Sequence, residues 1–347
     1  MKTSSIFAFL LVAVSMTASA TADFSATPGK TKTVAVPEHN GNFAKKWTLK
    51  AGANTDAIDS LDLALAGRAY VSYKDTLPEG VIGYVKVTGS SKDLVNAVTV
   101  GSDSIGDDDD DNDDLLDVDL DLDNVFDQGE LYVRLGNLNA NGHLLTEIVL
   151  APGAVQDIKS SHSAQVVIED GVLATNIKNA ELQIEAADSS AVFVSAAETA
   201  VNARELALKA TGTSRIEYQA DTVAIRSETQ VEAEGSAVIS VLSSTLTTNK
   251  LELEAQGTAT ICVDAAKVSA KRPVFLGRNK ISIPNADDKY RSTGTFECEE
   301  SELPARRPGK VVATGNATGF LRGSDGEDDD DDDNDLDLGD AINNVLN

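Results

Sequence analysis

The chain has 347 residues, of which 41% are hydrophobic and 5% aromatic, and its formal net charge is −27. This charge is local, because residues 101–127 hold 13 Asp and residues 323–340 hold 11 acidic residues, with no Lys or Arg in either stretch. The rest of the chain is nearly balanced and offers no clustered basic surface. Composition therefore argues against a nucleic-acid partner and against attraction to anionic lipid.

The first 20 residues predict a secretory signal peptide. Lys2 is followed by the short apolar run 6–14 and by Ala18-Ser19-Ala20, a small-residue cleavage pattern. The apolar run is too short to span a bilayer, although a buried N-terminal helix is the alternative. No later segment is apolar over 18 residues. We therefore expect a secreted, extracellular protein without membrane insertion.

Residues 21–45 are assigned to an N-terminal linker. They include ATPGKT at 26–31, which ends like a phosphate loop, but Phe24 stands where that loop needs its first glycine. Beyond the linker, apolar and polar residues alternate with a period of two, which is typical of β-strands. The apolar members of this alternation are Leu61, Leu63, Leu65, Val85, Val87, Leu131, Val133 and Leu135.

An acidic insertion at residues 101–128 interrupts the alternation. Residues 107–114 form a block of like charge, which we expect to be disordered because it repels itself and can bury no apolar area. Residues 116–123 instead alternate strictly between aliphatic and acidic side chains. In a strand, four carboxylates would lie on one face about 6.8 Å apart; they are Asp117, Asp119, Asp121 and Asp123. Carboxylates suit Ca²⁺, but this spacing forms no closed cage, so we predict at most weak Ca²⁺ binding, with a solvated spacer as the alternative.

From about residue 155 the alternation becomes a repeat. Its four phrases are LQIEAADSS (182–190), LALKATGTS (206–214), TQVEAEGSA (229–237) and LELEAQGTA (251–259). They share an alanine at steps of 24, 23 and 22 residues, namely Ala186, Ala210, Ala233 and Ala255. A fainter first copy at 157–167 has Ser160 at this position. A second short strand follows each turn, with Val192, Ile216, Ile239 and Ile261 in equivalent places.

This period predicts an all-β fold, a parallel β-helix or β-solenoid with rungs of about 22–26 residues over residues 46–300. A β-sandwich is the alternative, since its strands also recur every 8–12 residues or so. Inward residues should stack into an apolar core; examples are Leu182, Ile184, Leu206, Leu208, Val231, Leu251 and Leu253. The outward positions should form a solvated ladder of Glu185, Lys209, Glu232 and Glu254.

The order of these segments resembles a known family, the auto-transporter adhesin head domain, also called the GIN domain. The matching segments are LALAGRAYVSYK (63–74), VIGYVKVTGSSKDLVNAVTV (81–100), GELYVRL (129–135), LLTEIVLAPGAVQDIKSSHSAQVVI (144–168) and the repeated phrases. They cover roughly residues 46–280. The resemblance implies a right-handed β-helix and an adhesin-like role. The chain departs from the family in its turns, which lack Gly-Ser-Gly, and in its acidic insertion.

The two cysteines, Cys262 and Cys298, predict one disulfide in a secreted chain. Two buried thiols or an intermolecular link are the alternatives. The segment after Lys271, with Pro273 and Pro284, should cap the last rung and protect its edge from strand addition.

Residues 301–347 are assigned to a disordered acidic tail. Asn316, in the acceptor Asn-Ala-Thr, is a predicted glycosylation site. Arg306 and Arg307, before Pro308, are interpreted as part of an exposed linker, with a processing site as the alternative.

The sequence predicts no catalytic residues and no cofactor. It contains three histidines, no G-x-S-x-G nucleophile elbow and no H-E-x-x-H. We therefore expect a secreted, non-catalytic, adhesin-like binding or structural protein, with an extracellular or cell-wall glycan or protein as its ligand. The alternatives are an extracellular polysaccharide-active enzyme and an acidic, low-affinity Ca²⁺-binding matrix protein. A Ca²⁺-dependent thermal shift that is lost on deleting residues 101–127 and 323–347 would support the last.

Overall fold

The computed structural model describes residues 24–36, 41–52, 55, 57–102, 129–136, 141–290, 294–298 and 300–312. All of them belong to one compact unit, Met1–Ala313. The described part of the chain is almost entirely β-structure. Its helical elements are short: α1 (Lys92–Asn96), η2 (Arg278–Lys280) and α2 (Asp287–Tyr290).

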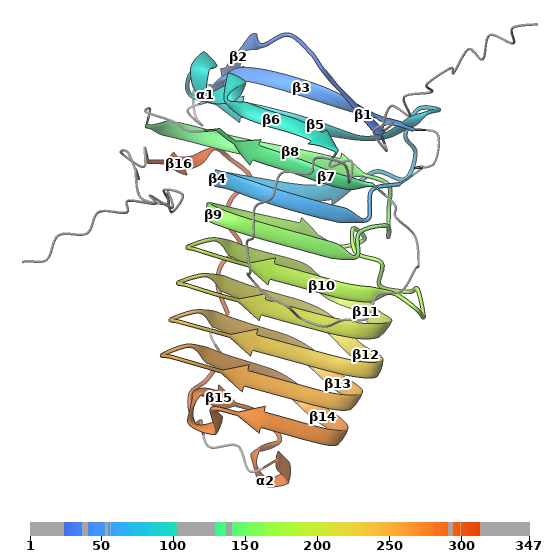
Figure 1. The fold of residues 1–347 in the computed structure, drawn as a ribbon, viewed down its shortest axis with the longest axis vertical. Helices are drawn as coiled ribbons and strands as arrows, with labels where there is room; N and C mark the ends of the chain where they lie inside the picture. The colour runs from blue at the N-terminus through green and yellow to red at the C-terminus, as the bar shows by residue number, and fades with distance from the viewer. Residues whose placement is uncertain are drawn as a thin grey trace, which may run out of the picture. The chain divides into compact units, whose positions relative to one another are not determined.

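The repeat region forms a parallel β-solenoid of about five turns (Figure 1). Its strands are β9 (Asp157–Glu169), β10 (Glu181–Ala186), β11 (Ala191–Ala210), β12 (Arg215–Ala233), β13 (Val238–Ala255) and β14 (Thr260–Leu276). Successive coils pair in parallel from β9 through to β14. The predicted solenoid is therefore confirmed, and the β-sandwich alternative is wrong for the repeats.

The register of the coils follows the shared alanine of the repeat. Ala186 pairs with Ala210, Ala210 with Ala233 and Ala233 with Ala255. Ser160 pairs with Ala186, so the fainter first copy is also a coil of the stack. Each step of the repeat is one turn of the solenoid.

Each coil has three faces, which are separated by two bends and one tight turn. In β11 the register with β12 shifts between Ala196 and Ala200 and between Ala203 and Glu205, which marks the bends. We call the strand segment before the tight turn the first face (Glu181–Ala186 in β10), the segment after it the second face (191–196) and the segment between the bends the third face (200–203). Inward side chains of the first face are at most 1% exposed: Leu182, Ile184, Leu206, Leu208, Val231, Leu251 and Leu253.

The tight turn of each coil requires a left-handed residue at one position. Asp188, Gly212, Gly235 and Gly257 all have positive φ, at 60°, 74°, 73° and 61°. They stack on one another, and a Cβ on Gly235 would lie 2.8 Å from the carbonyl oxygen of Gly212. Glycine at three of these turns therefore relieves both backbone strain and a steric clash.

A mostly antiparallel assembly covers the first coil. Its strands are β1 (Phe24–Pro28), β2 (Lys32–Val36), β3 (Gly41–Ala51), β4 (Ser60–Tyr73), β5 (Val81–Gly89), β6 (Val98–Ser102), β7 (Glu130–Leu135) and β8 (Gly142–Leu150). Strands β1, β3, β5 and β8 pair antiparallel in that order. Strand β8 then pairs in parallel with β4, and β4 with β9, which joins this N-terminal cap to the coils.

Two boundaries from the sequence therefore need correction. The predicted linker 21–45 contains β1, β2 and the start of β3, because Phe24 buries its ring (2% exposed) and β1 pairs along the length of β3. The parallel solenoid also does not extend back to residue 46, because β3, β5 and β8 run antiparallel to one another. Residues 43–49 lie in β3, a paired strand of the cap.

The predicted C-terminal cap of the last coil is present. Strand β15 (Ile281–Ser282) pairs with β14 at Ile261 and Cys262. Further along the same edge, the Tyr290 hydroxyl accepts a hydrogen bond from the Ala270 amide (2.8 Å) and lies 3.2 Å from the Val268 carbonyl oxygen. These contacts occupy backbone groups that an open edge would offer to another strand.

The chain then returns along the solenoid. Strand β16 (Gly309–Val311) pairs antiparallel with β8 of the N-terminal cap, and Val311 is 2% exposed. Residues 301–312 are therefore part of the folded unit and not of a tail, because Gly309 and Val311 pack against β8. The acidic insertion from residue 103 to 128 and the segment 313–347 lie outside the described residues.

Candidate functional site

The first face carries the predicted ladder. Glu185, Lys209, Glu232 and Glu254 occupy one continuous register position, as expected. Lys209 Nζ lies 3.3 Å from a Glu232 carboxylate oxygen. Ion pairs between partly exposed side chains contribute little stability each. In this ladder Lys209 and Glu232 form an ion pair, and Glu185 and Glu254 accept hydrogen bonds from the side-chain amides of Gln183 and Gln256.

A second charged position on the same face is also paired internally. Lys250 Nζ lies 2.6 Å from carboxylate oxygens of both Glu228 and Glu252. Hydrogen bonds to these two carboxylates raise the pKa of Lys250. The lysine therefore keeps its charge, and it has two internal partners already.

At the start of the first face, Asp157 is a carboxyl group with a shifted pKa. Burial raises its pKa, while the Lys159 charge and a hydrogen bond from Ser60 oppose the rise. The Lys159 ammonium lies 3.6 Å from the Asp157 carboxylate. Ser60 and Lys159 both contact Asp157 Oδ2, while the buried Oδ1 has no hydrogen-bond partner within the described chain.

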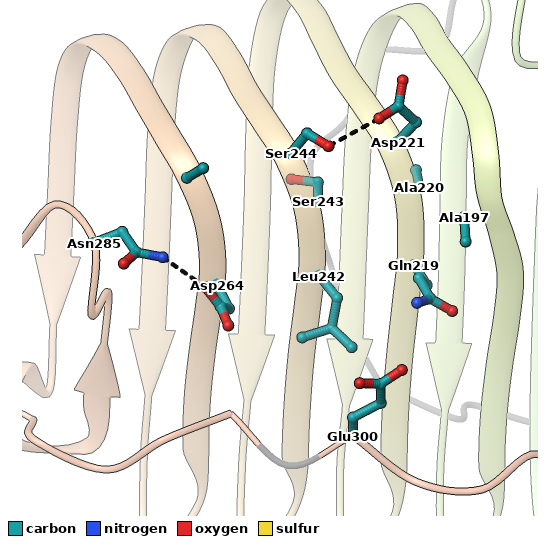
Figure 2. Close-up of a pocket in the computed structure, with 11 residues that line it drawn as sticks. Ala197, Gln219, Ala220, Asp221, Leu242, Ser243, Ser244, Asp264, Asn285 and Glu300 are labelled. Carbon is teal, nitrogen blue, oxygen red and sulfur yellow. Dashed lines mark hydrogen bonds between the residues drawn. The ribbon is translucent and has the colours of Figure 1, made fainter.

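A groove lies at the bend between the second and third faces (Figure 2). Its volume is about 360 Å³. The same bend in β11, β12, β13 and β14 builds most of the wall, and two further residues come from the C-terminal segment. The lining residues are Ala197, Gln219, Ala220, Asp221, Leu242, Ser243, Ser244, Asp264, Ala266, Asn285 and Glu300.

Two of the three groove carboxylates accept hydrogen bonds from groove neighbours. Ser244 Oγ donates to Asp221 Oδ1 at 2.8 Å, and Asn285 Nδ2 donates to Asp264 Oδ1 at 2.7 Å. These bonds hold the carboxylates in the wall, and each leaves lone pairs for another donor.

Glu300 differs from the other two acids of the groove. It is exposed, and no hydrogen bond or ion pair joins it to another residue among those the structure describes. Figure 2 shows its carboxylate directed towards Leu242 and Gln219. Opposite it, the buried Ser243 hydroxyl has no partner within the described chain. The groove therefore presents carboxylate, amide and hydroxyl groups that can hydrogen-bond to the hydroxyl or amino groups of a ligand.

Of the predicted disulfide, glycosylation and Ca²⁺ sites, only the disulfide lies within the described residues. Cys262 and Cys298 form the predicted disulfide, with a Cα–Cα distance of 5.3 Å, so the two alternatives are wrong. Asn316 lies outside the described residues, and so do the four predicted Ca²⁺ ligands Asp117, Asp119, Asp121 and Asp123; these sites stay predictions. In the described ranges no cluster of three or more His, Cys, Asp or Glu could hold a metal ion, and no helix is long and apolar enough to cross a membrane.

The groove itself was not predicted from the sequence. The signal that could have found it is a polar residue just after the second short strand of successive copies: Gln219, Asp221, Ser243, Ser244 and Asp264. Glu300 could not have been found in this way, because it reaches the groove from a distant segment.

No family model matches the chain, and no curated protein sequence does. Two solved structures match: a proposed adhesin from Parabacteroides merdae (13% identity, TM-score 0.29, covering 74% of this chain and 97% of that one) and a proposed cell adhesion protein from Clostridium sporogenes (11% identity, TM-score 0.27, covering 74% and 99%). At TM-scores this low, neither structure indicates a function for this chain. The function proposed below is based on the groove.

Proposed function

We propose that the chain is an exported, non-catalytic, adhesin-like protein that binds an extracellular glycan in the groove. The observation that carries the proposal is the groove itself, built from the same bend in successive coils and completed by Glu300. A signal-peptide-like start and a disulfide between Cys262 and Cys298 support export.

The chemistry of the walls favours a glycan. Gln219 and Asn285 offer amide groups, which can donate and accept, and Asp221, Asp264 and Glu300 add strong acceptors. Sugars present many hydroxyl donors and acceptors on one ligand, and an amino sugar adds a charged donor that would meet the Glu300 carboxylate, which has no partner among the described residues.

The arrangement supports binding more than catalysis. Asp221 and Asp264 are each held by a neighbouring donor, Ser244 and Asn285, at 2.8 Å and 2.7 Å. A glycoside hydrolase instead needs one carboxyl group that can deliver its proton to the leaving group and a second placed to attack or to activate water. The polysaccharide-active enzyme is kept as the alternative, because three carboxylates do share the groove.

The test is a glycan array with three forms of the full chain. Glu300→Gln removes the only groove carboxylate without a partner in the described chain, so we expect about a tenfold loss of affinity for a bound glycan, the cost of one charged hydrogen bond. Glu302→Gln is the matched control, because Glu302 is an exposed acid two residues away that does not line the groove. Its affinity should equal that of the wild type. Absence of any bound glycan, or equal losses in both variants, would contradict the proposal.

A further inference from the structure

The described residues 294–298 and 300–312 of the C-terminal segment, which we call the strap, cross the second face of the solenoid. Figure 1 shows it passing from the last coil to β16 beside β8. It follows one outward register position, which we call the central column. From the N-terminal cap to the last coil, the members of this column pair successively as Glu147, Tyr70, Val167, Phe193, Glu217, Ser240, Cys262 and Ser282.

At the last coil the strap is held by a covalent bond and by hydrogen bonds. Cys298 is bonded to Cys262 of the central column. Ser282 Oγ donates to the Phe296 carbonyl oxygen at 2.6 Å. Midway along, the Ser301 amide donates to Glu217 Oε2 at 3.0 Å, which satisfies a carboxylate that is only 4% exposed.

At the N-terminal cap the strap is held by charge and by strand pairing. Arg306 donates to Glu147 at 3.0 Å and to Glu169 at 3.1 Å. The Tyr70 hydroxyl donates to the Pro304 carbonyl oxygen. Strand β16 then pairs with β8. Arg306, which was expected in an exposed linker, is thus an anchor of the strap.

The length of the strap matches the path it covers. From Ser282 to Glu147 the central column makes seven steps between paired strands, about 34 Å at about 4.8 Å each. From Phe296 to Arg306 an extended chain spans ten residues, about 33 Å at about 3.3 Å each. The strap is therefore just long enough to span the coils between these two attachments.

Several outward side chains on the face beneath the strap are apolar and buried. Outward side chains of a solenoid are usually solvated, yet Tyr70, Val167 and Phe193 are only 2–6% exposed. They form a small apolar cluster with Leu145, separate from the main core. Burying this apolar cluster stabilises the strap in its position on the second face.

We propose that the strap is an axial clamp that couples the two ends of the solenoid, so that the coils open as one unit. Stacked repeats contact only their neighbours, and an unclamped stack can therefore open coil by coil from its end. With the clamp in place, the last coil can open only when its link to the N-terminal cap is also lost.

The test is hydrogen exchange of the full chain, followed by mass spectrometry in peptides of β13 and β14. Arg306→Gln removes the ion pairs of the strap at the N-terminal cap, seven strand steps from Ser282, and leaves the Tyr70 hydrogen bond and the β16 pairing in place. Because such pairs contribute little each, a clamp predicts about fivefold faster exchange in β14 of this remote variant, and at least tenfold faster exchange in the double variant Cys262→Ser, Cys298→Ser. Dithiol reduction of the folded wild type provides the same comparison if the double variant does not fold.

The control variant is Lys250→Ala, which removes ion pairs from the first face of β13 and leaves the strap untouched. Its exchange in β14 should stay within about twofold of the wild type. The clamp is disproved if Arg306→Gln changes exchange only in β8 and β16, or if exchange in β14 rises no more than in Lys250→Ala.

Discussion

Tyr218 is the largest fully buried side chain of the solenoid core. It occupies the same inward position as Val194, Val241 and Val263 in neighbouring coils. Its hydroxyl has no hydrogen-bond partner among the described residues, and burial raises the pKa of the phenol. An unpaired hydroxyl in an apolar core costs stability that the ring itself does not.

Tyr218→Phe is therefore expected to stabilise the protein by about 1 kcal/mol, because it removes only the unpaired hydroxyl. Chemical unfolding with urea measures this change. Tyr70→Phe is the control, since the Tyr70 hydroxyl donates to Pro304, and it should destabilise by a similar amount. A loss of stability in Tyr218→Phe would mean that its hydroxyl is bonded after all.

The stacked glycine turns give a second prediction. Gly235→Ala combines a positive φ of 73° with a Cβ only 2.8 Å from the Gly212 carbonyl oxygen. Gly80→Ala separates the two effects, because Gly80 has φ of 70° and nothing within 4 Å of the added Cβ. We expect a loss of about 1 kcal/mol for Gly80→Ala, the cost of the left-handed backbone, and about twice that or more for Gly235→Ala. Equal losses in urea unfolding would show that the stacking of turns adds no constraint.

Among the elements, β8 joins the main parts of the fold. It pairs antiparallel with β5, in parallel with β4, the strand that joins the cap to the coils, and antiparallel with β16 of the strap. Glu147 of this strand accepts hydrogen bonds from Lys86 at 2.8 Å and from Arg306 at 3.0 Å. A single carboxylate thus connects the cap to the strap.

This carboxylate predicts a specific acid sensitivity. Burial tends to raise the pKa of Glu147, but its bonds to Lys86 and Arg306 outweigh burial and lower it from 4.5. A lowered folded-state pKa stabilises the protein above the unfolded value, and this contribution is lost as the pH falls through the folded value. Glu147→Gln should therefore lower stability at about pH 6, and the difference from wild type should shrink at about pH 3. A difference in urea midpoint that is independent of pH would refute this assignment.

The elements of the repeat were predictable because each coil reuses the same short phrase. The alanine at 186, 210, 233 and 255 gave the correct register without any three-dimensional information. The strap was not predictable, since residues 294–312 contain no repeat and only Cys298 hints at its attachment. In the cap, β1 has just five residues and gains its stability from pairing with β3, a long-range contact that local patterning does not reveal.

At the scale of the folded unit, the coils lie between two caps and under one strap. The first face carries charged side chains, while the strap covers the central column of the second face. The groove forms where the strap, through Glu300, meets the bends of the coils. Its wall residues could be predicted from the repeat once the bend was known, but its closing acid depends on the path of a segment far along the chain.

A groove that holds a glycan without cleaving it leaves the glycan intact. This is measured by incubating the full chain with a glycan selected on the array and then determining the mass of the recovered glycan. We expect a glycan of unchanged mass that co-purifies with wild type and with Glu302→Gln, and much less with Glu300→Gln. Shortened or unsaturated products that form with wild type and vanish in Glu300→Gln would disprove non-catalytic binding and identify an enzyme.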